Sequence, residues 1–280
     1  MRAIDVCHLG RRHVICAWQV DDVIVDPGPE SSVDTLLDAL ADDRPRALLL
    51  THIHFDHAGA AGALVREWPD LEVWVHERGA HHLADPTRLV ASAKRLYGDD
   101  FDRLWGEVVA IPQENLRVLH GGESQDGWDV AYTPGHASHH VSYRHRDSGW
   151  AFTGDTTGVR LPPGALLLPP TPPPEFDLEA WRGSLDAVEA WEPQALAITH
   201  FGEHNDVSDH LARMREALAR WPELAARTDR DGYAQALRAE LAAALDEPDA
   251  ASFAQAMPPE DQWLGIDRYL SRLREADASG

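Results

Sequence analysis

Six consecutive residues constrain this chain more than any other part of its sequence: His52-Ile53-His54-Phe55-Asp56-His57. They follow an apolar stretch, residues 46–51, that predicts a short buried strand, and they precede a Gly/Ala-rich run that predicts the start of a helix. The end of a strand that runs into a helix is where α/β proteins commonly place functional residues. Imidazole nitrogens and a carboxylate oxygen suit zinc, iron or manganese. The segment therefore predicts a metal site, the alternative being histidines that only cap a helix or lie on the surface.

The composition is typical of a soluble globular protein. The 280 residues are 44% hydrophobic and 26% charged, which is enough for one large α/β domain or for one domain with an appendage. With 47 acidic and 25 basic residues the net charge is −22. We therefore expect a small-molecule substrate, with no binding to nucleic acid or to membranes. We find no signal-peptide pattern and no apolar run of membrane-spanning length, which predicts a cytoplasmic location. The two cysteines, Cys7 and Cys16, are expected to be buried thiols, although a disulfide across a hairpin is geometrically possible.

The hydrophobic pattern predicts alternating strands and helices. Strands are expected at residues 14–20, 23–25, 48–50, 72–75, 116–119, 128–132, 141–145, 150–152 and 195–198. Helices are expected near residues 33–40, 64–68, 77–105 and 177–191, and over nearly all of the chain after 206. Residues 158–174 are rich in Pro and Gly, so we expect a loop there that forms a wall of the active site, the alternative being a plain surface connection. A stripe of Trp263, Ile266, Leu270 and Leu273 predicts packing against the main domain, with a homodimer contact as the alternative.

Three later segments each consist of a short apolar strand that ends in a residue able to bind a metal. They end at His136, at Asp155 and at His200, and glycine precedes the first two, where it allows a tight turn. His52 and His54 could share a metal, but tetrahedral zinc needs more donors than these two. The three segments are expected to supply the rest.

In this order, the motifs His-x-His-x-Asp-His, Gly-His, Gly-Asp and His resemble those of the metallo-β-lactamase fold superfamily, and Asp26-Pro27-Gly28 is similar to its first motif. The resemblance covers residues 5–205. It implies an α/β fold, a four-layer αββα sandwich over residues 1–205, with a helical C-terminal extension, residues 206–280, packed on it. It also implies two divalent metal ions, zinc first, with iron or manganese as alternatives. In this interpretation His52, His54 and His136 hold the first metal, Asp56, His57 and His200 hold the second, and Asp155 bridges them. Asp26, Thr51 and His140 would support these ligands, and Thr199 either does the same as Thr51 or only fits its strand.

The resemblance implies a dinuclear metal-dependent hydrolase of the glyoxalase II-like or lactonase-like branch. A metal-bridging hydroxide would cleave a small carbonyl ester, thioester or lactone, with Asp56 and Asp155 as the catalytic carboxylates. The alternatives are a phosphodiesterase, which the negative charge disfavours, an iron-dependent oxidoreductase similar to persulfide dioxygenases, and a binding protein without activity.

The other histidines have less definite roles. His139 and His140 are expected to begin a strand, with one of the two facing solvent. His204 is a candidate for lining the groove. His76, His81 and His82 are expected to be structural or exposed.

Overall fold

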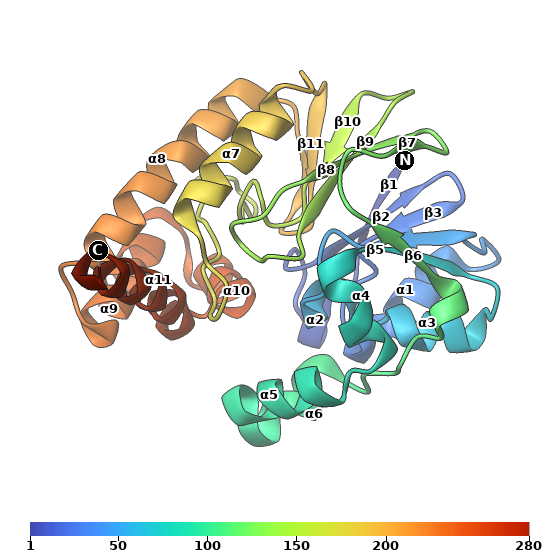
Figure 1. Ribbon diagram of the computed structural model, residues 1–280, viewed down its shortest axis with the longest axis horizontal. Coiled ribbons are helices and arrows are strands. Elements are labelled where there is room, and N and C mark those ends of the chain that lie inside the picture. The colour runs from blue at the N-terminus through green and yellow to red at the C-terminus, as the bar shows by residue number, and fades with distance from the viewer. Residues whose placement is uncertain (280) are drawn as a thin grey trace.

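The computed structural model describes residues 1–279, with side chains through residue 276, and shows two six-stranded sheets packed face to face. Helices cover the outer face of each sheet, and a group of C-terminal helices lies at one end of the molecule (Figure 1). The expected four-layer αββα sandwich with a helical C-terminal region is confirmed.

The first sheet has the strand order β1-β2-β3-β4-β5-β6. The first three strands are antiparallel and the last four are parallel to one another. Their bounds are β1 Arg2–Asp5, β2 Cys16–Val20, β3 Val23–Val25, β4 Ala47–Leu49, β5 Glu72–His76 and β6 Leu116–Leu119. Parallel neighbours need a crossover connection, so the carboxyl ends of β3 and β4 meet at the same edge of the sheet.

The second sheet has the order β12-β11-β10-β9-β8-β7 and is antiparallel except for the pair β10 and β11. Its strands are β7 Ser124–Gln125, β8 Trp128–Tyr132, β9 Val141–His145, β10 Trp150–Phe152, β11 Ala195–Ile198 and β12 Gly202–His204. The one parallel pair is connected through α7, Leu178–Glu189.

The remaining helices fill the connections and the C-terminal region. On the side of the first sheet they are α1 Val33–Leu40, α2 Phe55–Ala58, α3 Ala61–Glu67, α4 Glu77–Ala84, α5 Thr87–Tyr97 and α6 Phe101–Trp105. After the second sheet follow α8 Val207–Ala225, α9 Arg230–Ala244, α10 Glu247–Ala256 and α11 Pro259–Ser279. Short 3-10 turns are η1 His8–Gly10, η2 Glu30–Ser32, η3 Gly98–Asp100 and η4 Gln113–Asn115.

Large aromatic side chains fill the space between the sheets. Trp18 and Trp74 from the first sheet pack with Trp128, Tyr143 and Phe152 from the second. Such rings bury the most apolar area per residue, so they dominate the energy of this interface. A separate core joins β10 and β11 to α7 and to the C-terminal helices. The boundary at residue 205 stays a prediction, since α8 to α11 share this core with the second sheet.

Several local predictions differ from the structure. Strands β1, β7 and β12 were not expected, and all three are short strands at or near sheet edges. Leu273 of the predicted stripe is 45% exposed, while Trp263, Ile266 and Leu270 pack on the core. Both cysteines are free thiols, and only Cys16 is fully buried. Among residues 1–279, no helix combines the length and the apolar character needed to cross a bilayer.

Candidate metal centre

The predicted ligands lie where strands of both sheets end, at one common edge. Asp26 follows β3, and the segment from His52 to His57 follows β4 and includes the single turn α2. From the second sheet, the loop after β8 carries His136, and Asp155 and His200 follow β10 and β11. Segments more than a hundred residues apart in the chain therefore deliver polar side chains to one place.

The first group consists of three imidazoles. His54 Nδ1 lies 3.0 Å from His52 Nε2 and 2.9 Å from His136 Nε2. This spacing is close to that of imidazole donors around one zinc ion, which binds nitrogen at about 2.0–2.1 Å.

The second group consists of one carboxylate and two imidazoles. Asp56 Oδ2 lies 3.3 Å from His200 Nε2 and 3.9 Å from His57 Nε2. The Asp56 side chain is 20% exposed, whereas the two imidazoles are buried, so this group opens to solvent on the Asp56 side.

Asp155 lies between the two groups. Its Oδ2 is 3.3 Å from His136 Nε2, and its Oδ1 is 3.2 Å from His57 Nε2 and 3.7 Å from His200 Nε2. Asp155 Oδ1 and His57 Nε2 are buried but lack the geometry of a hydrogen bond, and neither has a partner among the described residues. Because unpaired buried polar atoms are unfavourable, this arrangement fits a pair of divalent cations with Asp155 between them.

The rings that point into the centre are held by their other nitrogen. His136 Nδ1 donates to the carbonyl oxygen of Pro170 at 2.8 Å, and His200 Nδ1 donates to that of Val14 at 2.7 Å. A proton fixed on Nδ1 leaves the lone pair of Nε2 directed into the centre, which is how metal-binding histidines are commonly oriented.

Asp26 is fully buried and supports both sheets at this edge. Its Oδ2 accepts hydrogen bonds from His57 Nδ1 at 2.8 Å, from Thr51 Oγ1 at 2.7 Å and from Thr199 Oγ1 at 2.8 Å. Its Oδ1 accepts a fourth bond from the backbone N–H of Thr51 at 2.8 Å. Both threonine hydroxyls thus bond to the carboxylate that orients His57, instead of only fitting their strands.

His140 lies behind Asp155. Its Nε2 accepts from the backbone N–H of Asp155 at 3.3 Å, and its Nδ1 lies 2.9 Å from Thr133 Oγ1. Gly154 has φ 46°, and a Cβ there would lie 2.4 Å from Thr51 Oγ1 and 2.8 Å from His140 Nε2. The glycine before Asp155 is therefore required by both its backbone conformation and the close packing around it.

The electrostatics differ between the two groups. Burial, together with a neighbouring imidazole, lowers the pKa of His54 to about 3, so this ring is neutral. Burial would also lower the pKa values of His57 and His200, but the nearby carboxylates, Asp155 foremost, outweigh burial and raise both. Burial would raise the pKa of Asp155, but the imidazoles around it, His57 first, hold it well below its usual value. Without metal, the carboxylates and the protonated forms of His57 and His200 therefore stabilise one another, and a cation that binds there competes with these protons.

The Pro-rich segment, residues 158–174, packs against α11 and forms one wall of the centre. Thr171 is fully buried. Its backbone N–H donates to Gln262 Oε1 at 2.5 Å, and its hydroxyl donates to the backbone carbonyl oxygen of Gln262 at 2.9 Å. Pro170, the residue before it, supplies the carbonyl that orients His136. The segment is thus a wall, as expected, and not a plain surface connection.

Two histidine predictions need correction. His139 and His140 precede the strand, which begins at Val141, and both are buried: His139, only 8% exposed, packs against the rings of His52 and His54. His204 does not reach the centre. It lies with Asp206 and His210, and Arg160 occupies the space between the latter two by hydrogen bonding to both.

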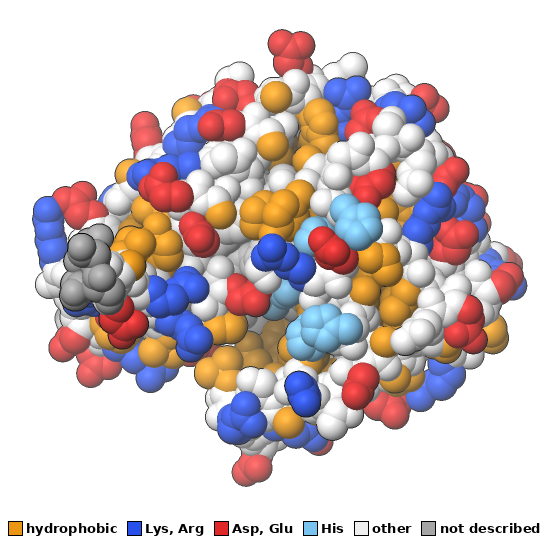
Figure 2. All heavy atoms as spheres, in the orientation of Figure 1, with side chains coloured by type: hydrophobic (Ala, Val, Ile, Leu, Met, Phe, Trp, Pro, Cys, Tyr) orange, Lys and Arg blue, Asp and Glu red, His pale blue; other side chains and the backbone are white. Residues whose placement is uncertain are grey.

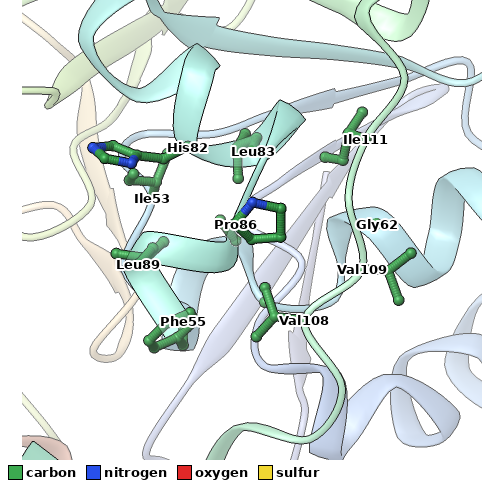
Figure 3. A pocket seen from close by; sticks show the side chains of 12 residues that line it. Ile53, Phe55, Gly62, His82, Leu83, Pro86, Leu89, Val108, Val109 and Ile111 are labelled. Carbon is green, nitrogen blue, oxygen red and sulfur yellow. The ribbon is translucent and has the colours of Figure 1, made fainter. Parts of the chain in front are cut away.

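The surface on this side is hollowed between the C-terminal helices and the arm formed by α5 and α6, and hydrophobic and histidine side chains gather around the hollow (Figure 2). Phe55, between two predicted ligands in the chain, turns toward the arm and lines a small apolar recess with Pro86, Leu89 and Val108 (Figure 3). The centre is therefore bordered by apolar surface on the side of α5.

Residues 21–200 match the family model described as the metallo-beta-lactamase superfamily. The chain belongs to this superfamily. An archaeal member, the metallo-beta-lactamase fold-containing protein ST1585 of Sulfurisphaera tokodaii, is 28% identical over 211 residues, 72% of this chain and 77% of that protein. Its crystal structure covers 95% of this chain and 97% of its own with a TM-score of 0.71 at 21% identity, which shows the same fold.

Two further similar proteins have more specific descriptions. A hydroxyacylglutathione hydrolase of Legionella pneumophila (strain Lens) is 29% identical over 113 residues, 40% of this chain and 33% of that enzyme. A structure of TTHA1623 in a di-iron-bound form has a TM-score of 0.52 at 26% identity and covers 74% of this chain and 92% of its own.

Three side chains near Asp56 were not among the site residues that the sequence predicted. His8 and Trp105 stack on each other, and Tyr97 packs on Trp105. They come from a loop before β2 and from the α5–α6 arm, so no motif or spacing in the sequence marks them. Only the crossing of these segments in the fold brings them together.

Proposed function

We propose that this metallo-beta-lactamase fold protein is a dinuclear metal-dependent hydrolase that cleaves small carbonyl esters, thioesters or lactones. The observation that carries the proposal is the position of Asp155, with one carboxylate oxygen facing each of two complete donor groups. His52, His54 and His136 would hold one cation, and Asp56, His57 and His200 the other. Bound divalent cations would lower the pKa of a shared water toward about 7 and polarise the substrate carbonyl.

The chain's own residues would supply orientation and proton transfer. Asp26, Pro170 and Val14 fix the rings that point into the centre, so little reorganisation is needed when charge develops there. Asp56 is the most exposed of the carboxylates at the centre and would receive the proton of the attacking water. It would then pass this proton to the departing oxygen or sulfur, so that water and ester become acid and alcohol or thiol.

Zinc is the proposed metal, and iron is the competing possibility because a similar structure, TTHA1623, is a di-iron-bound form. The two metals separate the functions. Zinc in the purified protein, with turnover of esters, thioesters or lactones, supports the hydrolase. Iron with oxygen consumption supports an oxidoreductase.

The test combines metal analysis with a substrate panel. We expect about two metal ions per chain and hydrolysis in at least one of the three substrate classes. Asp155→Ala should lose both metal and turnover while keeping its helical circular dichroism, and Asp147→Ala, an exposed carboxylate in the turn before β10, should keep both. Unchanged turnover in Asp155→Ala would refute the assignment.

A further inference from the structure

A second group of side chains lies beside Asp56 and has no role in the mechanism above. The rings of His8 and Trp105 are stacked, with centroids 5.6 Å apart and planes inclined by 9°. The ring of Tyr97 packs against Trp105 with centroids 5.4 Å apart, and the ring of Phe55 packs against Trp105 with centroids 6.0 Å apart. These four side chains are named the aromatic wall here. Since Phe55 directly precedes Asp56, the wall begins at the metal centre.

Two ring nitrogens of the aromatic wall lack a partner. His8 Nε2 and Trp105 Nε1 are buried, and no atom in the described part of the chain forms a hydrogen bond with either. The His8 side chain is only 2% exposed. Ser32 Oγ lies 3.5 Å from His8 Nδ1, and with this hydroxyl as the donor the neutral His8 ring carries its proton on Nε2. Because a buried ring N–H without an acceptor is unfavourable, an oxygen atom that the chain does not supply is expected at this place.

The backbone around His8 is strained and is held in place by another element. Cys7 and Leu9, its two neighbours, have left-handed φ values of 49° and 54°. Gln255 of α10 donates from Nε2 to the carbonyl oxygen of His8 at 2.9 Å and accepts from Arg11 Nε at 3.0 Å. Strain of this kind persists only where the surroundings enforce it, and it is found most often at ligand sites.

The aromatic wall carries no charge at neutral pH. Burial lowers the pKa of His8, and the carboxylate of Asp56 is the strongest of the nearby charges that oppose this shift. Burial, followed by the charge of Asp56, raises the pKa of Tyr97. Both rings are thus neutral, and an indole completes a surface suited to an uncharged, flat, apolar group. The effect of Asp56 on both also places the aromatic wall within electrostatic reach of the metal centre.

We propose that the aromatic wall binds the acyl group of the substrate, and that this group is an aromatic ring with an oxygen substituent that accepts a hydrogen bond from His8 Nε2 or Trp105 Nε1. Packing against Tyr97 and Trp105, the two half-buried rings of the aromatic wall, recognises the flat face, and the two ring nitrogens recognise the oxygen. In naming an acyl group, this inference rests on the proposed hydrolase function. The binding site itself does not depend on turnover.

The experiment compares two carboxylates, which are the products of such a hydrolysis, on the zinc-loaded protein by isothermal titration calorimetry. The pair 4-methoxybenzoate and 4-ethylbenzoate has the same length and differs in one oxygen. We expect the methoxy compound to bind about 2- to 10-fold more tightly, as one net hydrogen bond implies. The double variant His8→Phe with Trp105→Phe keeps an aromatic ring at each position but removes both ring nitrogens, so this preference should fall to about 1-fold. Trp150→Phe, at a half-buried position on β10, is the matched control and should keep the preference.

The outcomes are distinct. If the unmodified protein binds 4-methoxybenzoate and 4-ethylbenzoate with equal affinity, the inference is overturned. A water molecule bound to the two ring nitrogens would give this result. A full preference in the double variant, or no binding of either carboxylate, also overturns it. If the double variant does not hold metal, each single variant is tested in its place. A protein that prefers the methoxy compound but hydrolyses no ester, thioester or lactone contradicts the hydrolase proposal and leaves the aromatic wall as a binding site.

Discussion

Replacement of Asp26 by asparagine tests how far the metal centre depends on a residue that does not point into it. The carboxylate accepts four hydrogen bonds, three of them at Oδ2. The amide oxygen of asparagine can take the position of Oδ2, but its NH2 group then faces the backbone N–H of Thr51. That donor loses its acceptor at a cost of about 1–3 kcal/mol, and the three remaining bonds lose the strength that a charged acceptor gives them.

We therefore expect Asp26→Asn to lower the free energy of unfolding of the metal-free protein by roughly 2–5 kcal/mol. Because His57 Nδ1 loses its charged acceptor, the affinity of the second metal should fall by about 10- to 100-fold. Urea unfolding measures the first quantity, and competition with a chelator of known zinc affinity measures the second.

Asp38→Asn, an exposed position on α1, is the control and should change neither quantity. If Asp26→Asn binds two zinc ions as tightly as the unmodified protein, the four hydrogen bonds of Asp26 do not orient His57 for metal binding.

Three further changes test other parts of the structure. Gln262→Leu removes the acceptor of the buried Thr171 N–H and should lower the affinity for the first metal by about 10-fold in the same chelator competition. Unchanged affinity would show that α11 does not support the Pro-rich segment, residues 158–174. Gly135→Ala should lower the free energy of unfolding in urea by about 2–4 kcal/mol, because φ there is +132° and a Cβ would lie 2.3–2.6 Å from atoms of α7. Gly183→Ala is the control, since it has open space around it and should not destabilise the protein. Equal destabilisation by the two substitutions would contradict the predicted clash at Gly135. Burial lowers the pKa of His210 in the folded protein to about 4. As the pH falls below about 6.5, the unfolded chain therefore takes up a proton at this histidine before the folded protein does. The folded protein loses roughly 3 kcal/mol of stability in this way by about pH 4. His210→Gln should therefore make stability less dependent on pH between these values, and an unchanged slope would speak against this histidine as its source.

The convergence of the candidate ligands was predictable from the sequence because each segment that carries them follows an apolar strand. The strands before His52, His136, Asp155 and His200 are short and apolar, and their ends meet once the two sheets pack. The spacing within residues 52–57 also marks these side chains as a group.

The support around the centre was only partly predictable. Asp26 is part of a motif, but the carbonyl oxygens of Pro170 and Val14 are backbone atoms, and no residue type identifies them. The short edge strand β12, Gly202–His204, was missed because three residues with two polar side chains show no alternation. His139 was placed wrongly because its burial depends on contacts with His52 and His54, which a local pattern does not contain.

Gly265 on α11 has a consequence for how the proposed pair of cations would be held. A Cβ at this position would lie 2.3 Å from the carbonyl oxygen of Thr171, so the helix approaches the Pro-rich segment as closely as a glycine allows. In the proposed dinuclear centre, one cation position would thus depend on the far C-terminal part of the chain, while the other would depend on Asp26 in the first sheet. Substitutions in α11 would therefore alter one position and spare its neighbour, and such a centre would be able to release its ions one after the other or to accept two different elements.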